Sequence, residues 1–322
     1  MRIRSLTLHL RWDEDFAVVD DFMRVADALR PLTVRASVTP PPPRAAEKVI
    51  SKLRDLGVKY VSALHLFYGA EEIYKFVSQY GVFASTTDVA EYIKFLKIIY
   101  SKGEVHLSRY VSLLLGGLVF NSPYFPASIT TKRGVSLSLL YPNDLNTIND
   151  VSEALRRGEE WGRYVAEALG LEFLGVDGSL SPWGEESVAK AVERIFNTEL
   201  GSPGSHYAIR LLNRAIEEAG VKKTGFNEVM LPLAEDEELK RLVWEGRLQL
   251  RDFVSYTSVC IPGLDMAPIR VGDWEALRRL LYDLAAIAEA KKRAVGVRIF
   301  PVDVDEYDVE GFGKTPALRL TF

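Results

Sequence analysis

The feature of the sequence that most constrains its fold is a regular alternation of strand-like and helix-like segments over the first hundred residues. Residues 2–10 and 33–38 have the apolar character and the length of strands. Residues 16–29 and 44–56 instead repeat apolar side chains with the period of a helix. The alternation continues with strands expected at 58–66 and 81–85, and with helices expected at 70–79 and 88–101. Strands and helices that alternate with short connections favour a parallel sheet covered by helices.

The second half of the chain adds further strands and helices without a low-complexity linker or a break in composition. Strands are expected at 108–119, 134–140, 171–177, 226–233, 295–302 and 316–322, and helices at 147–169, 184–196, 204–219 and 273–291. About ten strands with helices outside predict an α/β body that is either barrel-like or doubly wound. We therefore expect one domain over residues 1–322 rather than two independent domains.

The charge balance and the apolar runs exclude some classes of protein. The chain has 40 Lys and Arg against 44 Asp and Glu, a net charge of −4, which argues against nucleic-acid binding. The longest strongly apolar run without a charge, residues 110–120, is about half of the roughly 20 residues that a membrane helix needs. The first ten residues lack the apolar core of a signal peptide. We expect a protein that acts neither on nucleic acids nor in membranes.

Cysteine and glutamine are scarce in this chain. A single cysteine, Cys260, excludes an intrachain disulfide and a cysteine-based zinc site. The cytoplasm is therefore the expected compartment. Glutamine occurs only at Gln79 and Gln249 while ionic residues are abundant, a composition typical of proteins from high-temperature organisms.

Asp177 ends the predicted strand at 171–177 and is followed by a Gly-Ser turn that includes Ser179. Active sites of α/β proteins gather at this end of the strands, because the loops converge there over the sheet. A carboxylate in this place can bind a cation or act as a base. An equally strong alternative is that Asp177 caps the turn or the next helix with its side-chain oxygens.

The segment 259–269, VCIPGLDMAPI, places Cys260 in an apolar run and Asp265 between Leu and Met. Such a cysteine is usually a small buried hydrophobic residue, although a nucleophile is the functional alternative. An acidic side chain among apolar neighbours is costly unless it is paired or solvated, so Asp265 is the stronger candidate. A hard cation held by Asp177, Asp265 and Glu228 is a further alternative.

Two arginines lie within apolar strand patterns, Arg35 in TVRASV and Arg298 in VGVRIF. Facing a pocket, either guanidinium could hold a carboxylate or a phosphate with two hydrogen bonds. An internal pair with an aspartate is the structural alternative. The motif GSPGSH opens the predicted helix at 204–219, where the free amides after Gly204 could attract an anion.

Several motifs taken together resemble the domain-of-unknown-function 711 family, which is also called uncharacterised protein family 0210. The matching segments are TVRASVTPPP, FNSPYFPAS, GVDGSLSP, GSPGS, NEVMLPLAED, CIPGLDMAPI and AVGVRIFPV, in this order along the chain. The resemblance implies the pyruvate formate-lyase-like fold of the glycyl-radical enzymes. That fold is a ten-stranded barrel of two parallel five-stranded halves, with helices outside.

Glycyl-radical enzymes carry a cysteine into the barrel on a finger loop, and Cys260 before Pro262 and Gly263 is the cysteine that resembles it. Their radical glycine lies near the C-terminus, follows an arginine and precedes an aromatic residue. Neither Gly296 nor the segment 310–316 has this pattern, so a radical mechanism is not expected.

These observations predict a pocket for a small anionic metabolite, which the protein binds and could also transform. Its expected catalytic residues are Asp177, Cys260 and Asp265, and its expected binding residues are Arg35, Ser179, Gly204 and Arg298. The sequence implies no particular cofactor. The alternatives are a non-catalytic sensor that reports to a partner, in the manner of a small amino-acid-binding regulatory protein, and an inert homo-oligomeric scaffold.

Overall fold

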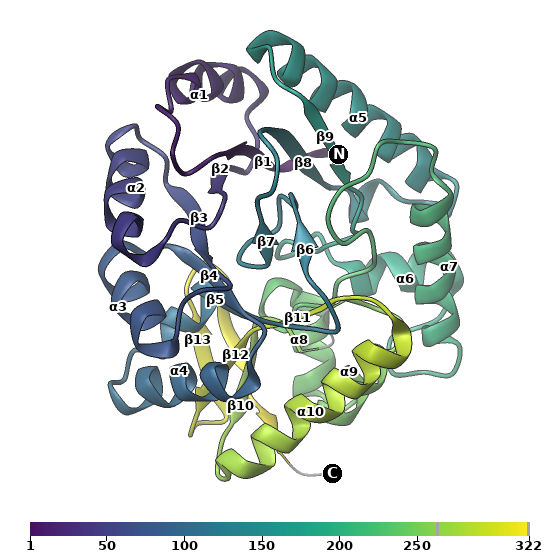
Figure 1. Cartoon of the computed structure of the whole chain (residues 1–322). Helices are drawn as coiled ribbons and strands as arrows, with labels where there is room; N and C mark the ends of the chain where they lie inside the picture. The colour runs from purple at the N-terminus through teal and green to yellow at the C-terminus, as the bar shows by residue number, and fades with distance from the viewer. Residues whose placement is uncertain (262–263, 321–322) are drawn as a thin grey trace.

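An eight-stranded sheet organises the chain in the computed structural model, which describes residues 1–261 and 264–320 (Figure 1). Along the sheet the order is β11-β5-β4-β3-β2-β1-β8-β9. These strands are β1 (Arg2–Leu10), β2 (Thr33–Val38), β3 (Tyr60–His65), β4 (Phe83–Thr86), β5 (Val111–Leu115), β8 (Gly134–Leu140), β9 (Phe173–Asp177) and β11 (Val295–Val297). Strands β1 to β5 are parallel to their neighbours, whereas β8 and β11 join this parallel block in antiparallel fashion.

Three smaller sheets contain the remaining strands. The first has the order β12-β10-β15, and the others pair β13 with β14 and β6 with β7. Their bounds are β6 (Val119–Phe120), β7 (Ser128–Ile129), β10 (Ala267–Arg270), β12 (Ile299–Val302), β13 (Glu306–Val309), β14 (Gly313–Pro316) and β15 (Leu318–Arg319). In Figure 1, β6 and β7 lie at the centre of the molecule, and β7 contacts β2 and β3. The loop at 121–128 is thus inside the curve of the large sheet.

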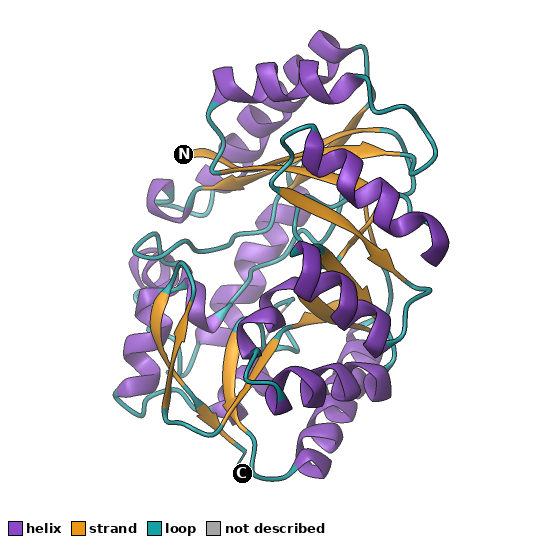
Figure 2. Cartoon of the chain, turned by 90° about the vertical axis from the view of Figure 1, so that its left-hand side faces the viewer, coloured by secondary structure: helices purple, strands orange, loops and turns teal. Residues whose placement is uncertain are grey.

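Helices surround these strands, as Figures 1 and 2 both show. They are α1 (Val18–Leu29), α2 (Pro43–Asp55), α3 (Ala70–Tyr80), α4 (Val89–Ser101), α5 (Asp150–Leu169), α6 (Val188–Phe196), α7 (Ser205–Glu218), α8 (Glu237–Trp244), α9 (Leu250–Tyr256) and α10 (Trp274–Lys291), with short 3-10 helices η1 (Val105–Tyr110), η2 (Pro142–Asp144) and η3 (Leu233–Glu235). Their ends follow local chemistry: Pro43 starts α2, and Gly170 ends α5 with a left-handed φ of 61°.

The predicted α/β class is confirmed, and the strands at 2–10, 33–38 and 134–140 have the predicted bounds. The structure does not show the expected ten-stranded barrel of two parallel halves. Its largest sheet mixes parallel and antiparallel neighbours and is open, with β11 and β9 at the edges.

Two of the predicted strands are irregular in the structure. Residues 226–233 form no regular strand, although single bonds such as Met230 N to Leu180 O remain. The predicted strand 295–302 is interrupted at Arg298, where the Tyr92 hydroxyl accepts a hydrogen bond from Ile299 N. Part of the last predicted strand, 321–322, lies outside the described residues.

Apolar side chains form one large core between the sheet and the helices, a smaller cluster within the curve of the sheet, and a third cluster around Phe300. The smaller cluster includes Leu114, Tyr124, Phe226, Met230 and Ile261. Four of these side chains, from residues 124, 226, 230 and 261, also face the cavity described next. Among the described helices, none combines the length and the apolar character that a bilayer crossing requires.

Candidate functional site

A cavity with about 870 Å³ of empty space, part of it open to solvent, lies inside the curve of the large sheet. On one side it is lined by side chains of β1, β2, β4 and β5 and of the 124–127 segment. On the other side it is lined by residues from the 226–235, 261–266 and 296–298 segments. Parts of the chain more than 200 residues apart therefore meet around one space.

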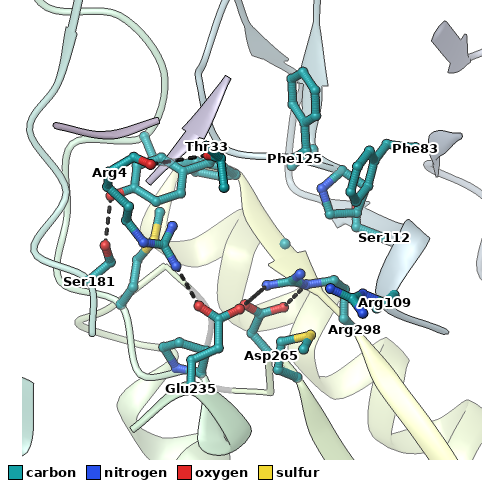
Figure 3. Close-up of a pocket in the computed structure, with 18 of the residues that line it drawn as sticks. Arg4, Thr33, Phe83, Arg109, Ser112, Phe125, Ser181, Glu235, Asp265 and Arg298 are labelled. Atoms are coloured by element: carbon teal, nitrogen blue, oxygen red, sulfur yellow. Dashed lines mark hydrogen bonds and ion pairs between the residues drawn. The ribbon is translucent and has the colours of Figure 1, made fainter. Parts of the chain in front are cut away.

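Four charged side chains form a chain of ion pairs along the cavity wall (Figure 3). Arg4 Nη2 lies 2.5 Å from Glu235 Oε2, and Arg298 Nη2 lies 3.2 Å from Glu235 Oε1. Arg298 also donates from Nε and Nη2 to both oxygens of Asp265, at 2.5 and 2.6 Å. Arg4 and Arg298 thus share Glu235, which joins the strand β1 to the interruption between β11 and β12.

The pKa values of the Arg298 pair follow from burial and from the pairing. Burial raises the pKa of Asp265 above its ordinary value, and the Arg298 charge opposes the rise. Burial alone would lower the pKa of Arg298, but the carboxylates of Asp265 and Glu235 outweigh burial and raise it. The guanidinium therefore stays charged beside the carboxylate of Asp265.

Arg35 is a buried cavity residue with a different environment. Its Nε donates to Thr33 Oγ1 at 2.9 Å, and its Nη1 donates to the carbonyl of Pro123 at 3.0 Å. The guanidinium carbon lies 5.1 Å from the centre of the Phe125 ring and 5.9 Å from that of Tyr60. No ion pair found among residues 1–261 and 264–320 includes Arg35. Both of its fixed partners are neutral oxygens, and its positive charge is left without a carboxylate.

The pKa of Arg35 reflects this environment. Burial, with the nearby charge of Arg4 as the second cause, lowers the pKa of Arg35 to about 9. Two other polar atoms of the cavity residues are buried and find no hydrogen-bond partner within the described chain, Arg4 Nε and Ser112 Oγ. The cavity-lining residues thus include two buried polar atoms without partners in addition to the guanidinium of Arg35.

Asp177 and Ser179 are buried, but neither lines the cavity. The Asp177 carboxylate accepts hydrogen bonds from the hydroxyls of Ser122 and Ser179 and from the amides of residues 179, 226 and 227. Burial raises the pKa of Asp177, and these donors oppose the rise. A Cβ at Gly225 would lie 2.1 Å from Asp177 Oδ2, so glycine is required there. The carboxylate holds the 122–124 and 225–227 segments against the end of β9.

Cys260 also lies away from the cavity, in the large apolar core. Burial raises the pKa of its thiol to about 12, so the thiol is protonated at neutral pH. Its carbonyl accepts a hydrogen bond from Lys291, which also pairs with Glu228. The turn expected at Pro262 and Gly263 lies outside the described residues, and the loop at the centre of the fold, 121–128, contains no cysteine.

Gly204 is the N-cap of α7, with a left-handed φ of 97°, and it too lies away from the cavity. Of the seven expected site residues, the structure brings Arg35, Asp265 and Arg298 to one cavity. Asp177, Asp265 and Glu228 do not form a joint cluster, and the described residues contain no group of three or more His, Cys, Asp or Glu placed to hold a metal ion.

Arg4, Glu235 and Ser112 line the cavity but are not among the site residues expected from the sequence. Arg4 lies in an apolar strand pattern, the signal that singled out Arg35 and Arg298. Glu235 belongs to the acidic run AEDEEL, which resembles an ordinary helix start. Two adjacent residues of this run have different roles: Glu235 faces the cavity, whereas Asp236 caps helices.

Comparison with known proteins places the chain in a family. The family model described as "Uncharacterised ACR (DUF711)" matches residues 144–307, just over half of the chain. A UPF0210 protein of Methanopyrus kandleri is 35% identical over 196 residues, which cover 55% of this chain and 43% of that protein.

UPF0210 proteins of Pyrobaculum islandicum and Lactiplantibacillus plantarum are each 33% identical, over 56% and 58% of this chain and 44% of their own lengths. The matched region thus spans less than half the length of these curated relatives. Because the family model covers more than half of the chain, this protein belongs to the DUF711 family.

Proposed function

We propose that this protein binds a small organic anion in the cavity and that Arg35 holds the anion. The observation that carries the proposal is a buried guanidinium without a carboxylate partner in the described chain. Burying an unpaired charge is costly, and chains keep such groups mainly where a ligand uses them. The fixed bonds to Thr33 and Pro123 hold the guanidinium in one orientation, as a binding group requires.

The neighbouring polar atoms support the same proposal. Arg4 Nε and Ser112 Oγ are buried donors of cavity residues without partners in the described chain, and a bound anion would supply acceptors. Arg4 and Arg35 both line the cavity, and the charge of Arg4 is the second cause that lowers the pKa of Arg35. The rest of the lining is largely aromatic and apolar, as in small-molecule pockets generally.

A chemical transformation of the bound anion is the more specific form of this proposal. Asp265 lines the cavity, and its pKa is raised, so it is the group best placed to move a proton. The alternative, a sensor that binds without turnover, is favoured by the two hydrogen bonds that occupy both Asp265 oxygens. Turnover of a bound compound distinguishes the two.

We also infer that the segments around the cavity form an irregular version of the expected barrel. Support comes from a parallel bridge between Val176 and Lys223, which continues the sheet beyond β9. Further bonds run from Leu233 N and Ala234 N to the carbonyls of Asp265 and Met266, next to β10. Strand β10 then pairs with β12, which continues from β11.

The experiment is a screen of organic acids by thermal shift and calorimetry, with each compound quantified after incubation. We expect at least one acid to bind, and Arg35→Gln to weaken its binding by roughly tenfold or more, because a charge-assisted hydrogen bond contributes about 1.5–3 kcal/mol. Arg278→Gln is the matched control, since Arg278 pairs with Glu275 on the outer surface of α10. Consumption of the acid favours the enzyme, and a thermal shift without consumption favours the sensor. Equal binding to the wild type and to Arg35→Gln would refute the proposal.

A further inference from the structure

We propose that the anion is an aromatic monocarboxylate, with its carboxylate on Arg35 and its ring among the aromatic side chains of the cavity. This inference rests on the proposed function and specifies the chemical class of the ligand. Two observations carry it: the charge balance of the cavity and the cluster of rings around Arg35.

The charges of the cavity residues cancel except for one. Arg4 and Arg298 are balanced by Glu235 and Asp265 through the chain of ion pairs. Arg109 also lines the cavity, and it pairs at 2.8 Å with Glu310, which lies between β13 and β14. Among the cavity-lining residues that the structure describes, Arg35 therefore supplies the single positive charge without an ion-pair partner.

One uncompensated charge suits a monoanion better than a dianion. A carboxylate carries one negative charge and accepts two hydrogen bonds in one plane, which matches a guanidinium. A phosphate ester that carries two negative charges would be left with one unneutralised, close to the carboxylates of Glu235 and Asp265. The cavity therefore favours a carboxylate over a phosphate.

Two aromatic rings lie against the guanidinium of Arg35, and a third ring lies beside both of them. Phe83 lies 5.3 Å from Phe125 and 6.3 Å from Tyr60, measured between ring centres, and the last two rings both lie against Arg35. Figure 3 shows Phe83 and Phe125 beside Ser112, away from the Arg4–Glu235 pair. All three rings line the cavity. An anion on Arg35 would thus extend its body among aromatic faces and edges.

Flat, aromatic ligands fit such surroundings better than saturated ligands of similar size. Aromatic pairs in offset or edge-to-face arrangements contribute about 0.5–1.5 kcal/mol beyond the burial of apolar area. This difference corresponds to roughly a two- to tenfold preference for a ring with π electrons over a saturated ring.

The test uses benzoate, cyclohexanecarboxylate, acetate, phenyl phosphate and benzamide as probes, with ligand-observed NMR and calorimetry at neutral pH on the whole chain. We expect benzoate to bind most tightly, by roughly two- to tenfold over cyclohexanecarboxylate. Phenyl phosphate and acetate should bind more weakly than benzoate, and the uncharged benzamide should not compete with it.

Two phenylalanines of equal burial provide matched variants, since Phe125 and Phe76 are each 6% exposed but only Phe125 lines the cavity. Phe125→Leu should reduce the preference of the protein for benzoate over cyclohexanecarboxylate, and Phe76→Leu should leave it unchanged. Circular dichroism on both variants checks that they fold, and Tyr60→Leu gives a second test of the ring cluster if Phe125→Leu does not fold.

The outcomes separate this inference from the proposed function. If an acid from the wider screen binds through Arg35 but none of the aromatic probes binds, only this inference is overturned. If binding does not depend on Arg35, the proposed function itself is wrong. If probes bind through Arg35 but phenyl phosphate or cyclohexanecarboxylate binds as tightly as benzoate, only the assignment to aromatic monocarboxylates is overturned.

Discussion

At the scale of single residues, the protein buries ionisable groups in two different ways. Arg35 is buried with its charge and without a carboxylate partner in the described chain, whereas the histidines of the large sheet are buried neutral. His65 is held between the hydroxyls of Ser62 and Ser85, at 2.9 and 2.7 Å. Both arrangements make stability depend on pH, in windows set by the pKa shifts.

Acid should destabilise the fold through its buried histidines. Burial lowers the pKa of His65 from 6.5 to about 3, and that of His9 by the same amount. Between these pH values the unfolded chain binds more protons than the folded one, so the free energy of unfolding falls as the pH drops from about 6.5 toward 3. We expect His65→Gln to show a shallower fall over this window in urea titrations, because one titrating group is gone.

The exposed His106 provides the control for this measurement. His106→Gln should retain the pH dependence of the wild type. If the free energy of unfolding fell as steeply with pH in His65→Gln as in the wild type, the buried imidazole of His65 would not resist protonation.

At the scale of elements, one carboxylate organises two helices. Asp236 Oδ2 accepts hydrogen bonds from Val188 N and Ala189 N at the start of α6. Its Oδ1 accepts from Glu238 N and Leu239 N at the start of α8. A single buried side chain therefore satisfies free amides at two helix ends.

Removing this double cap should be unusually costly. We expect Asp236→Ala to lower the free energy of unfolding by about 2–4 kcal/mol, because each cap contributes about 1–2 kcal/mol. Asp236→Asn, which keeps one oxygen acceptor, should lie between the wild type and Asp236→Ala. Asp88 caps only α4, so Asp88→Ala is the matched single-cap control, with an expected loss of about 1 kcal/mol. Equal losses for the two alanine variants, measured by chemical denaturation, would contradict the double role.

At the scale of the whole molecule, ion pairs between distant parts of the chain hold the cavity wall together. Glu235 in η3 holds Arg4 of β1 on one side and Arg298, between β11 and β12, on the other. The Arg4 and Glu235 side chains are each only 6% exposed, so these charges have little access to water. Such pairs fix how the segments meet more than they add net stability.

Breaking this chain of ion pairs should therefore destabilise the fold strongly. We expect Glu235→Gln to lower the free energy of unfolding by about 3–5 kcal/mol, because it leaves buried guanidinium groups without their carboxylate. The surface pair of Glu245 with Arg241 is the control, and Glu245→Gln should change stability by less than about 1 kcal/mol. The double variant Arg4→Met/Glu235→Gln should recover part of the loss. If Glu235→Gln and Glu245→Gln gave the same denaturation curve, that result would contradict a structural role of the chain of ion pairs.

The sequence by itself determined the α/β class and the positions of most helices and strands. These follow from local chemistry: the period of apolar side chains marks β1, β2 and β8, and Gly170 marks the end of α5. It also indicated that Arg35, Asp265 and Arg298 are polar residues set in apolar surroundings. The period of a strand, however, does not tell which charged side chains will meet, because pairing depends on contacts between residues far apart in the chain.

Only the tertiary structure decided which of the candidate residues share a site. It separated Asp177, which is occupied by five hydrogen bonds from nearby loops, from the cavity that Asp265 and Arg298 line. It also brought Arg4 to Glu235 across 231 residues and left Arg35 without a carboxylate partner in the described chain. The physical reason is that charge compensation is a property of three-dimensional neighbours. Local patterns can show that a charge is buried, but only the assembled fold shows what neutralises it.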